Sequence, residues 1–69
     1  MTLKAFLDLY DNWNGITIIN DNNLAPLIKG TTSAIAFEDG SLYDEDIMAS
    51  EVIAFGFYDN ELTIRVDYL

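Results

Sequence analysis

In the last third of the chain, Glu51 to Tyr68, which reads EVIAFGFYDNELTIRVDY, large apolar residues alternate with small ones over 53–57 and with polar ones over 61–67. Alternation with a period of two is typical of β-strands. The central pair Asp59-Asn60 tolerates the positive φ angles that a type I′ turn requires. The pattern therefore predicts a β-hairpin, in which a two-residue loop pairs Tyr58 with Glu61 and fixes the register of every later pair.

This register gathers the large apolar side chains of both strands on one face. The predicted pairs on that face are Phe57 with Leu62, Phe55 with Ile64, and Ile53 with Val66. The opposite face receives smaller or more polar pairs, which are Gly56 with Thr63, Ala54 with Arg65, and Val52 with Asp67. We expect the apolar face to form the core, so that Phe55→Ala would open a cavity and cost about 3–5 kcal/mol of stability.

The first residues of the chain have the apolar spacing of a helix. Leu3, Phe6, Leu7 and Tyr10 follow one another at i, i+3, i+4 and i+7. Thr2 is a suitable N-cap residue. The spacing predicts a helix from Leu3 to Tyr10 or Asp11 that stops in Asn12-Trp13-Asn14-Gly15, where Gly15 suits a left-handed position.

The middle of the chain has shorter patterns. The β-branched run Ile16 to Asn20 predicts a strand, followed by a turn at 21–23. We expect one helical turn that carries Leu24, Leu27 and Ile28, with Pro26 in its first turn and Gly30 at its end. Thr31 to Phe37 predicts a second strand. Ser41 to Met48 is either a short helix or an acidic loop, because its periodicity does not separate the two.

These elements predict one domain over residues 1–69, of the α+β class. The economical arrangement is a small, mostly antiparallel sheet of three or four strands, with the C-terminal hairpin in it and the N-terminal helix packed on one face. Phe6, Leu7 and Tyr10 would then meet the apolar face of the hairpin. A chain of 69 residues is near the lower limit for independent folding, and its 51% hydrophobic content compensates for this.

The charge is strongly negative, with twelve acidic residues, three basic residues and a net charge of −9. Direct binding of nucleic acid or of an anionic membrane is disfavoured, because both depend on Lys and Arg. The favoured partners are basic protein surfaces or cations. The chain has no cysteine, no recognisable signal peptide and no apolar stretch of membrane-spanning length, so we expect it in the cytoplasm of a host cell.

The sequence lacks several side chains that enzymes commonly use in catalysis. It contains no histidine and no cysteine, so a Ser or Thr nucleophile would lack its usual base, and few cations could stabilise an oxyanion. Residues 10–21 fail as a calcium-binding loop, because placing Gly15 at position six puts Tyr10 at position one and Asp21 at position twelve. We therefore expect no enzyme activity, no cofactor and no metal site.

The acidic segment, residues 38–46, is the candidate partner-binding site. Its five carboxylates belong to Glu38, Asp39, Asp44, Glu45 and Asp46. They could imitate the charge density of a nucleic-acid backbone and dock on residues that hold phosphates. Tyr43, inside the segment, and Trp13 are candidate contact anchors, because aromatic residues are enriched at binding hot spots, and the alternative for Trp13 is a side chain that covers the core. The alternative is that the segment is an exposed loop that keeps the protein in solution.

Two stretches, YDNWNG (10–15) and EVIAFGFYDNELTIRV (51–66), resemble those of small uncharacterised proteins carried by phages and mobile elements of gut Firmicutes. The resemblance covers about half of the chain, carries no catalytic motif and transfers no site residues. It implies a context in which small acidic proteins often inhibit host defence, anti-CRISPR proteins being an example. The expectation is an inhibitor that binds a basic surface of a host nucleic-acid-binding protein such as a CRISPR effector.

Two other functions remain open at this point. The first is an interaction module that acts through an apolar surface, such as a homodimer formed at a sheet edge. The second is a protein that sequesters a small signalling nucleotide, for which only Lys4, Lys29 and Arg65 could neutralise phosphates.

Overall fold

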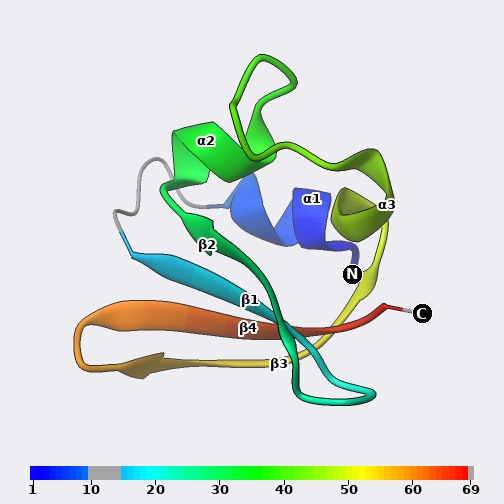
Figure 1. Ribbon diagram of the computed structural model, residues 1–69, viewed down its shortest axis with the longest axis vertical. Coiled ribbons are helices and arrows are strands. Elements are labelled where there is room, and N and C mark those ends of the chain that lie inside the picture. The colour runs from blue at the N-terminus through cyan, green and yellow to red at the C-terminus, as the bar shows by residue number, and fades with distance from the viewer. Residues whose placement is uncertain (10–14, 69) are drawn as a thin grey trace.

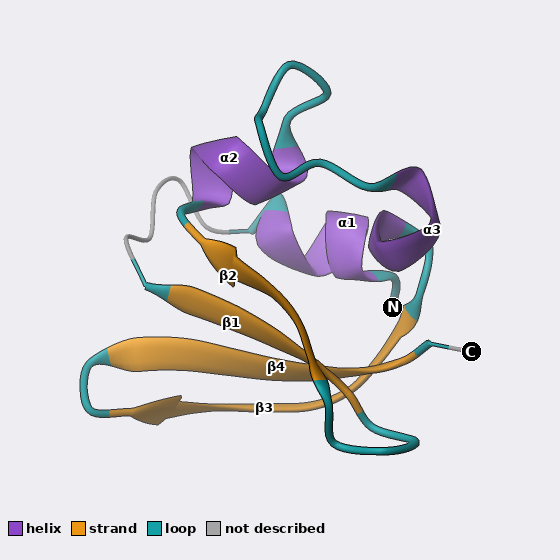
Figure 2. Ribbon diagram, in the orientation of Figure 1, coloured by secondary structure: helices purple, strands orange, loops and turns teal. Residues whose placement is uncertain are grey.

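Four strands and three short helices make up the computed structural model, which describes residues 1–9 and 15–68 (Figure 1). The helices are α1 (Leu3–Leu7), α2 (Thr32–Ala36) and α3 (Glu45–Met48). The strands are β1 (Ile16–Asn20), β2 (Pro26–Gly30), β3 (Glu51–Tyr58) and β4 (Glu61–Asp67). They form one sheet in the order β2-β1-β4-β3, and the predicted α+β class is confirmed (Figure 2).

The C-terminal hairpin forms as predicted, with one correction. Asp59 and Asn60 have φ angles of 53° and 65°, as a type I′ turn requires. The pairs nearest the turn have the predicted register, from Tyr58 with Glu61 to Ala54 with Arg65. A β-bulge between Val52 and Ala54 then shifts the register by one residue. The prediction for the far end is therefore wrong: Val66 faces Val52 and Asp67 faces Glu51, while Ile53 lies in the bulge.

The first helix begins where the sequence predicts. The Thr2 hydroxyl accepts a hydrogen bond from the Ala5 amide at 3.2 Å and caps α1. Leu3, Phe6 and Leu7 are buried. The helix ends at Leu7 with Asp8 as its C-cap, so the prediction that it continues to Tyr10 or Asp11 is wrong. Trp13 lies outside the described residues.

The predicted helical turn around Leu27 is wrong, because residues 26–30 form β2. The strand pairs antiparallel with β1, which places Ile28 opposite Ile18. Leu24 adopts a φ of 59° and its amide donates to the Asn20 carbonyl at 2.7 Å, so the chain reverses directly after β1. Pro26 begins an edge strand, where its missing N–H removes no ladder hydrogen bond.

The predicted strand at 31–37 is also wrong, because this segment contains α2. The Thr31 hydroxyl accepts from the Ala34 amide at 3.2 Å and caps the helix. Thr32, Ile35 and Ala36 are buried at the i, i+3, i+4 spacing of one helical face. In a five-residue segment, burial of that face against the sheet outweighs β propensity. The region 41–48 divides: its first part is a turn, and its last four residues form α3.

The core lies between the helices and one face of the sheet. The three helices contribute to a single buried cluster with β1 and β4, from which Ile16, Ile18, Leu62, Ile64 and Val66 have no exposed surface. β1 and β4 are parallel, with Ile18 opposite Ile64. The uncovered face carries the intervening residues, such as Thr17 and Thr63. No helix within residues 1–9 and 15–68 has the length and apolar character to cross a membrane.

Candidate functional site

Three large apolar side chains on β3 are exposed, and together they define the β3 strip: Ile53, Phe55 and Phe57. Their exposed fractions are 51%, 55% and 50%. The prediction that they belong to the core is therefore wrong. Phe55 and Phe57 pair with the buried residues Ile64 and Leu62, so they project from the covered face of the sheet. However, β3 is the outermost strand, and the helices are too short to extend fully over it.

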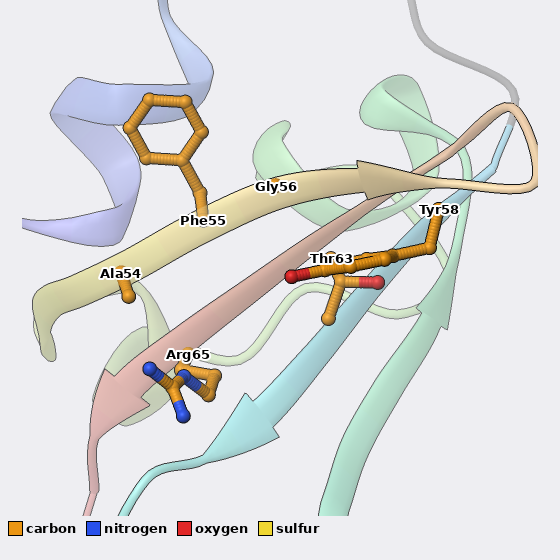
Figure 3. Close-up of a pocket in the computed structure, with 6 residues that line it drawn as sticks. All are labelled: Ala54, Phe55, Gly56, Tyr58, Thr63 and Arg65. Atoms are coloured by element: carbon orange, nitrogen blue, oxygen red, sulfur yellow. The ribbon is translucent and has the colours of Figure 1, made fainter.

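The edge of the helix layer contacts the strip at Phe55. The rings of Phe6, from α1, and Phe55 lie 4.8 Å apart with an interplanar angle of 58°, which is a favourable tilted contact. Figure 3 shows Phe55 pointing toward α1, on the side of β3 opposite to Ala54 and Arg65. Phe55 thus contacts α1 and remains 55% exposed.

An open apolar groove runs between α1 and the start of β3. It has a volume of about 630 Å³ and is lined by Met1, Phe6, Leu9, Val52, Ile53, Ala54 and Phe55. Every lining residue is apolar, and Leu9 and Met1 are themselves mostly exposed. A groove of this size and composition suits an apolar side chain of a partner.

The backbone of β3 is paired on its outer side only at its beginning. The Val52 amide donates to the Met1 carbonyl at 2.8 Å, and the Leu3 amide donates to the Ser50 carbonyl at 2.9 Å. Thr2 and Glu51 form an isolated antiparallel bridge between these two bonds. In the strand order of residues 1–9 and 15–68, β3 is the outermost strand of the sheet.

The two edges of the sheet differ in whether they carry residues that discourage pairing with another chain. Edge strands commonly carry proline or lysine, which discourage pairing with another chain. The β2 edge has both, in Pro26 and Lys29. The β3 edge has neither, and after its bulge it runs as Ala-Phe-Gly-Phe-Tyr over residues 54–58. The β3 edge is thus the one suited to pairing.

Each positive group within residues 1–9 and 15–68 forms an ion pair with a carboxylate. Lys4 Nζ lies 3.2 Å from Asp8 Oδ1 and also donates to the Ala36 carbonyl at 3.1 Å. The other ion pairs are Lys29 with Glu61 at 3.6 Å, Arg65 with Asp21 at 3.5 Å, and the Met1 amino group with Glu51 at 2.9 Å. The carboxylates that remain give the molecule a negative field.

The carboxylates of the predicted acidic site are exposed, and one of them, Asp44, also stabilises a helix. Asp44 caps α3, since its Oδ1 accepts from the Asp46 and Ile47 amides at 3.0 and 3.1 Å. Glu45 and Asp46 are exposed in the first turn of α3, while Glu38 and Asp39 lie exposed after α2. None of these five carboxylates forms an ion pair with the basic groups of residues 1–9 and 15–68.

Tyr43, the predicted anchor inside the acidic segment, is half-buried and packs against the core cluster. The chain after α2 rises above the helix layer before it returns to α3, so the segment is not one flat patch (Figure 1). Among the described residues, no three acidic side chains are grouped closely enough to hold a metal ion.

A second hollow lies on the uncovered face of the sheet (Figure 3). It is lined by Ala54, Phe55, Gly56, Tyr58, Thr63 and Arg65 and has a volume of about 180 Å³. The Tyr58 ring lies across Gly56, where an added Cβ would be 3.1 Å from ring atoms. Small-molecule sites usually have volumes above about 300 Å³, so this hollow is a poor candidate for one.

Comparison of the chain with protein-family models, with curated proteins and with solved structures finds no match.

The β3 strip is the feature that sequence reasoning missed. The alternation in β3 correctly placed Phe55 and Phe57 on one face with Leu62 and Ile64. What it did not provide was the strand order, which decides whether that face is covered. The available signal was compositional, because residues 52–58 contain no charge and no proline and read as a central strand or as a binding edge.

Proposed function

We propose that this protein is a non-enzymatic binding protein that inhibits a partner by occupying a basic surface of that partner. The observation that carries the proposal is the exposed β3 strip on an otherwise acidic molecule. Contiguous exposed apolar side chains on a soluble domain commonly mark an interaction surface. Two of the three strip residues are phenylalanines, and buried aromatic anchors dominate the energetics of many interfaces.

The proposed interface has an apolar centre and an acidic surround. The strip would supply most of the binding energy by its burial. The carboxylates around the molecule would steer association with a basic partner and reject acidic ones, since complementary charge affects the association rate and specificity. The acidic segment at 38–46 contributes to this field through carboxylates that no basic group of the described chain neutralises.

The target class that we propose is a nucleic-acid-binding protein of a host defence system, such as a CRISPR effector. The net charge of −9 and the resemblance to phage and mobile-element proteins support this choice. A basic groove that holds phosphates would attract this molecule, and its occupation would displace nucleic acid by competition.

The test begins with capture of partners on immobilised protein at low and high salt, and continues with the purified candidate. The proposal expects one-to-one binding that weakens as salt rises, because the Debye length falls to about 8 Å at physiological ionic strength. It also expects the bound protein to compete with the nucleic acid of the partner. Binding that is insensitive to salt and leaves nucleic-acid affinity unchanged would contradict the proposed inhibition.

A second candidate is a homodimer formed through the β3 edge. The position of β3 at the edge of the sheet favours it. The charge of −9 on each copy opposes it, because two such copies repel each other. Light scattering over a range of concentrations separates the two: a dimer that persists at low salt would support this candidate, and a monomer at all concentrations would exclude it.

A further inference from the structure

We propose that Met1 is a redox-sensitive site, at which hydrogen peroxide oxidises the thioether to a sulfoxide and thereby weakens apolar binding in the groove between α1 and β3. This inference rests on the proposed function, because it assigns a means of regulation to the apolar surface that would bind the partner. The occupant of the groove that the oxidation would affect is an apolar side chain of the partner.

Met1 is held beside the groove by its backbone. The Met1 carbonyl accepts a hydrogen bond from the Val52 amide at 2.8 Å, and the next residue, Thr2, forms an antiparallel bridge with Glu51. The side chain of Met1 lines the groove together with residues 52–55 of β3. Pairing with β3 therefore fixes the backbone from which this side chain reaches the groove.

The two methionines of the sequence differ greatly in their access to solvent. Met1 is 60% exposed, whereas Met48, in α3, is 2% exposed and belongs to the core cluster. The sequence has no cysteine that would react with a peroxide first. Hydrogen peroxide is uncharged, so the negative field of the protein does not repel it as it would repel an anionic oxidant. Met1 is therefore the thioether that hydrogen peroxide reaches in the folded protein.

The reaction transfers one oxygen atom to sulfur. A lone pair of the Met1 Sδ attacks one oxygen of hydrogen peroxide, an S–O bond forms and the O–O bond breaks. The departing hydroxide takes the proton of the transferred oxygen and leaves as water. Sulfur loses two electrons and the peroxide gains them, so methionine and hydrogen peroxide give methionine sulfoxide and water. Methionine sulfoxide reductases return the sulfoxide to the thioether, with a dithiol as the reductant.

Oxidation changes the character of the groove. Its lining residues are apolar, with Phe6, Ile53 and Phe55 among the larger ones. The sulfoxide oxygen requires hydrogen-bond donors, and an apolar group that covers it removes water without replacing it, which is unfavourable. The thioether, in contrast, is flexible and adapts its shape to an apolar partner. Oxidation would thus lower the affinity of the groove and leave every carboxylate of the negative field in place.

The experiment uses Nile red, a neutral apolar dye, as the probe of the groove. The full chain with Met48→Leu, a volume-conserving change, is titrated with the dye before and after treatment with hydrogen peroxide. This variant leaves Met1 as the one methionine of the sequence, and mass spectrometry of its peptides locates the added oxygen. Oxidation of Met1 should weaken dye binding by at least about fivefold. Methionine sulfoxide reductases with dithiothreitol should restore it, which excludes damage to other residue types as the cause.

The wild type and two further variants control for selectivity and location. In the wild type, Met1 should be oxidised at least about tenfold faster than Met48, because reaction follows exposure. Ile53 and Phe37 are 51% and 50% exposed, but Phe37 follows α2 and lies outside the groove. Ile53→Ser should weaken dye binding by at least about tenfold, and Phe37→Ser should not. A melting curve for each variant shows that it is folded.

The outcomes distinguish this inference from the proposed function. Equal oxidation of Met1 and Met48, or unchanged dye affinity after Met1 is oxidised, would overturn the redox site and leave the proposed inhibitor in place. Absence of dye binding, or dye binding that Ile53→Ser does not weaken, would overturn the groove as an apolar site and the inference with it. Failure to capture a basic partner at low salt, beside the expected dye results, would overturn the inhibitor and keep the redox site.

Discussion

Phe55 and Ile64 face each other across the β3–β4 hairpin, yet Ile64 is completely buried and Phe55 is 55% exposed. The two side chains project from the same face of the sheet, so the alternation of the sequence treats them alike. Their difference arises from strand order, because β4 lies inside the sheet and β3 lies at its edge. The same face of the hairpin is therefore part of the core along β4 and exposed to solvent along β3.

The first prediction follows from this difference. Ile64→Ala should lower the free energy of unfolding by about 2–5 kcal/mol, because it leaves a cavity in the core. Phe55→Ala should cost about 1–2 kcal/mol, mainly through loss of the contact with Phe6 and partial burial. Urea unfolding of both variants measures the two values. Equal losses would indicate that Phe55 is buried in solution.

The second prediction concerns Asp44. Removal of its carboxylate in Asp44→Ala should cost about 0.5–2 kcal/mol, because the Asp46 and Ile47 amides lose their cap. Asp39→Ala serves as the control, since Asp39 is exposed and should change stability by less than about 0.5 kcal/mol. Thermal melts compare them. A charge reversal that tests partner binding should therefore spare Asp44, and an unchanged melt for Asp44→Ala would refute its capping role.

The third prediction concerns Gly40, which lies against the backbone of α2. An added Cβ would lie 2.3 Å from the Ala34 carbonyl oxygen and 2.6 Å from that of Ser33. Because backbone cannot move aside cheaply, Gly40→Ala should cost about 1–3 kcal/mol. Gly15→Ala should cost less, since its nearest neighbour is the flexible Glu61 side chain. Denaturant unfolding tests the ranking, and the reverse order would contradict the packing described here.

The fourth prediction concerns the turn residue Asn60, whose φ is 65°. Asn60→Val should destabilise the protein by about 1–3 kcal/mol, because a β-branched residue is strained in this conformation. Asn60→Gly should be much better tolerated, since glycine adopts positive φ without strain. Chemical denaturation of the two variants provides the comparison. Similar stability for both would indicate that the turn changes its type.

The sequence was most informative where a pattern was long or a cap was specific. Alternation over residues 51–67, together with Asp59-Asn60, predicted the hairpin and most of its register. It did not predict the bulge at Ile53, which directly follows the part of β3 that is hydrogen-bonded to residues 1–3. The Thr2 cap and the following apolar spacing likewise predicted the start of α1.

The short central elements were not predictable in the same way. The local pattern predicts the wrong type of element for residues 26–30 and 31–37, because five-residue segments take the structure that the rest of the fold permits. An available edge on β1 makes Pro26–Gly30 a strand, and the sheet surface makes Thr32–Ala36 a helix. The predicted acidic residues are exposed, but the β3 strip depends on strand order, which no local pattern encodes.

We propose the β3 strip as the surface by which this protein binds its partner. The most direct test is the dissociation constant of the purified partner for the wild type, for Phe57→Ser and for Phe37→Ser at one salt concentration. Phe57→Ser should weaken binding by at least about tenfold, while Phe37→Ser should bind as the wild type does, and both variants should remain folded. Wild-type affinity in folded Phe57→Ser, or a greater loss in Phe37→Ser, would contradict it.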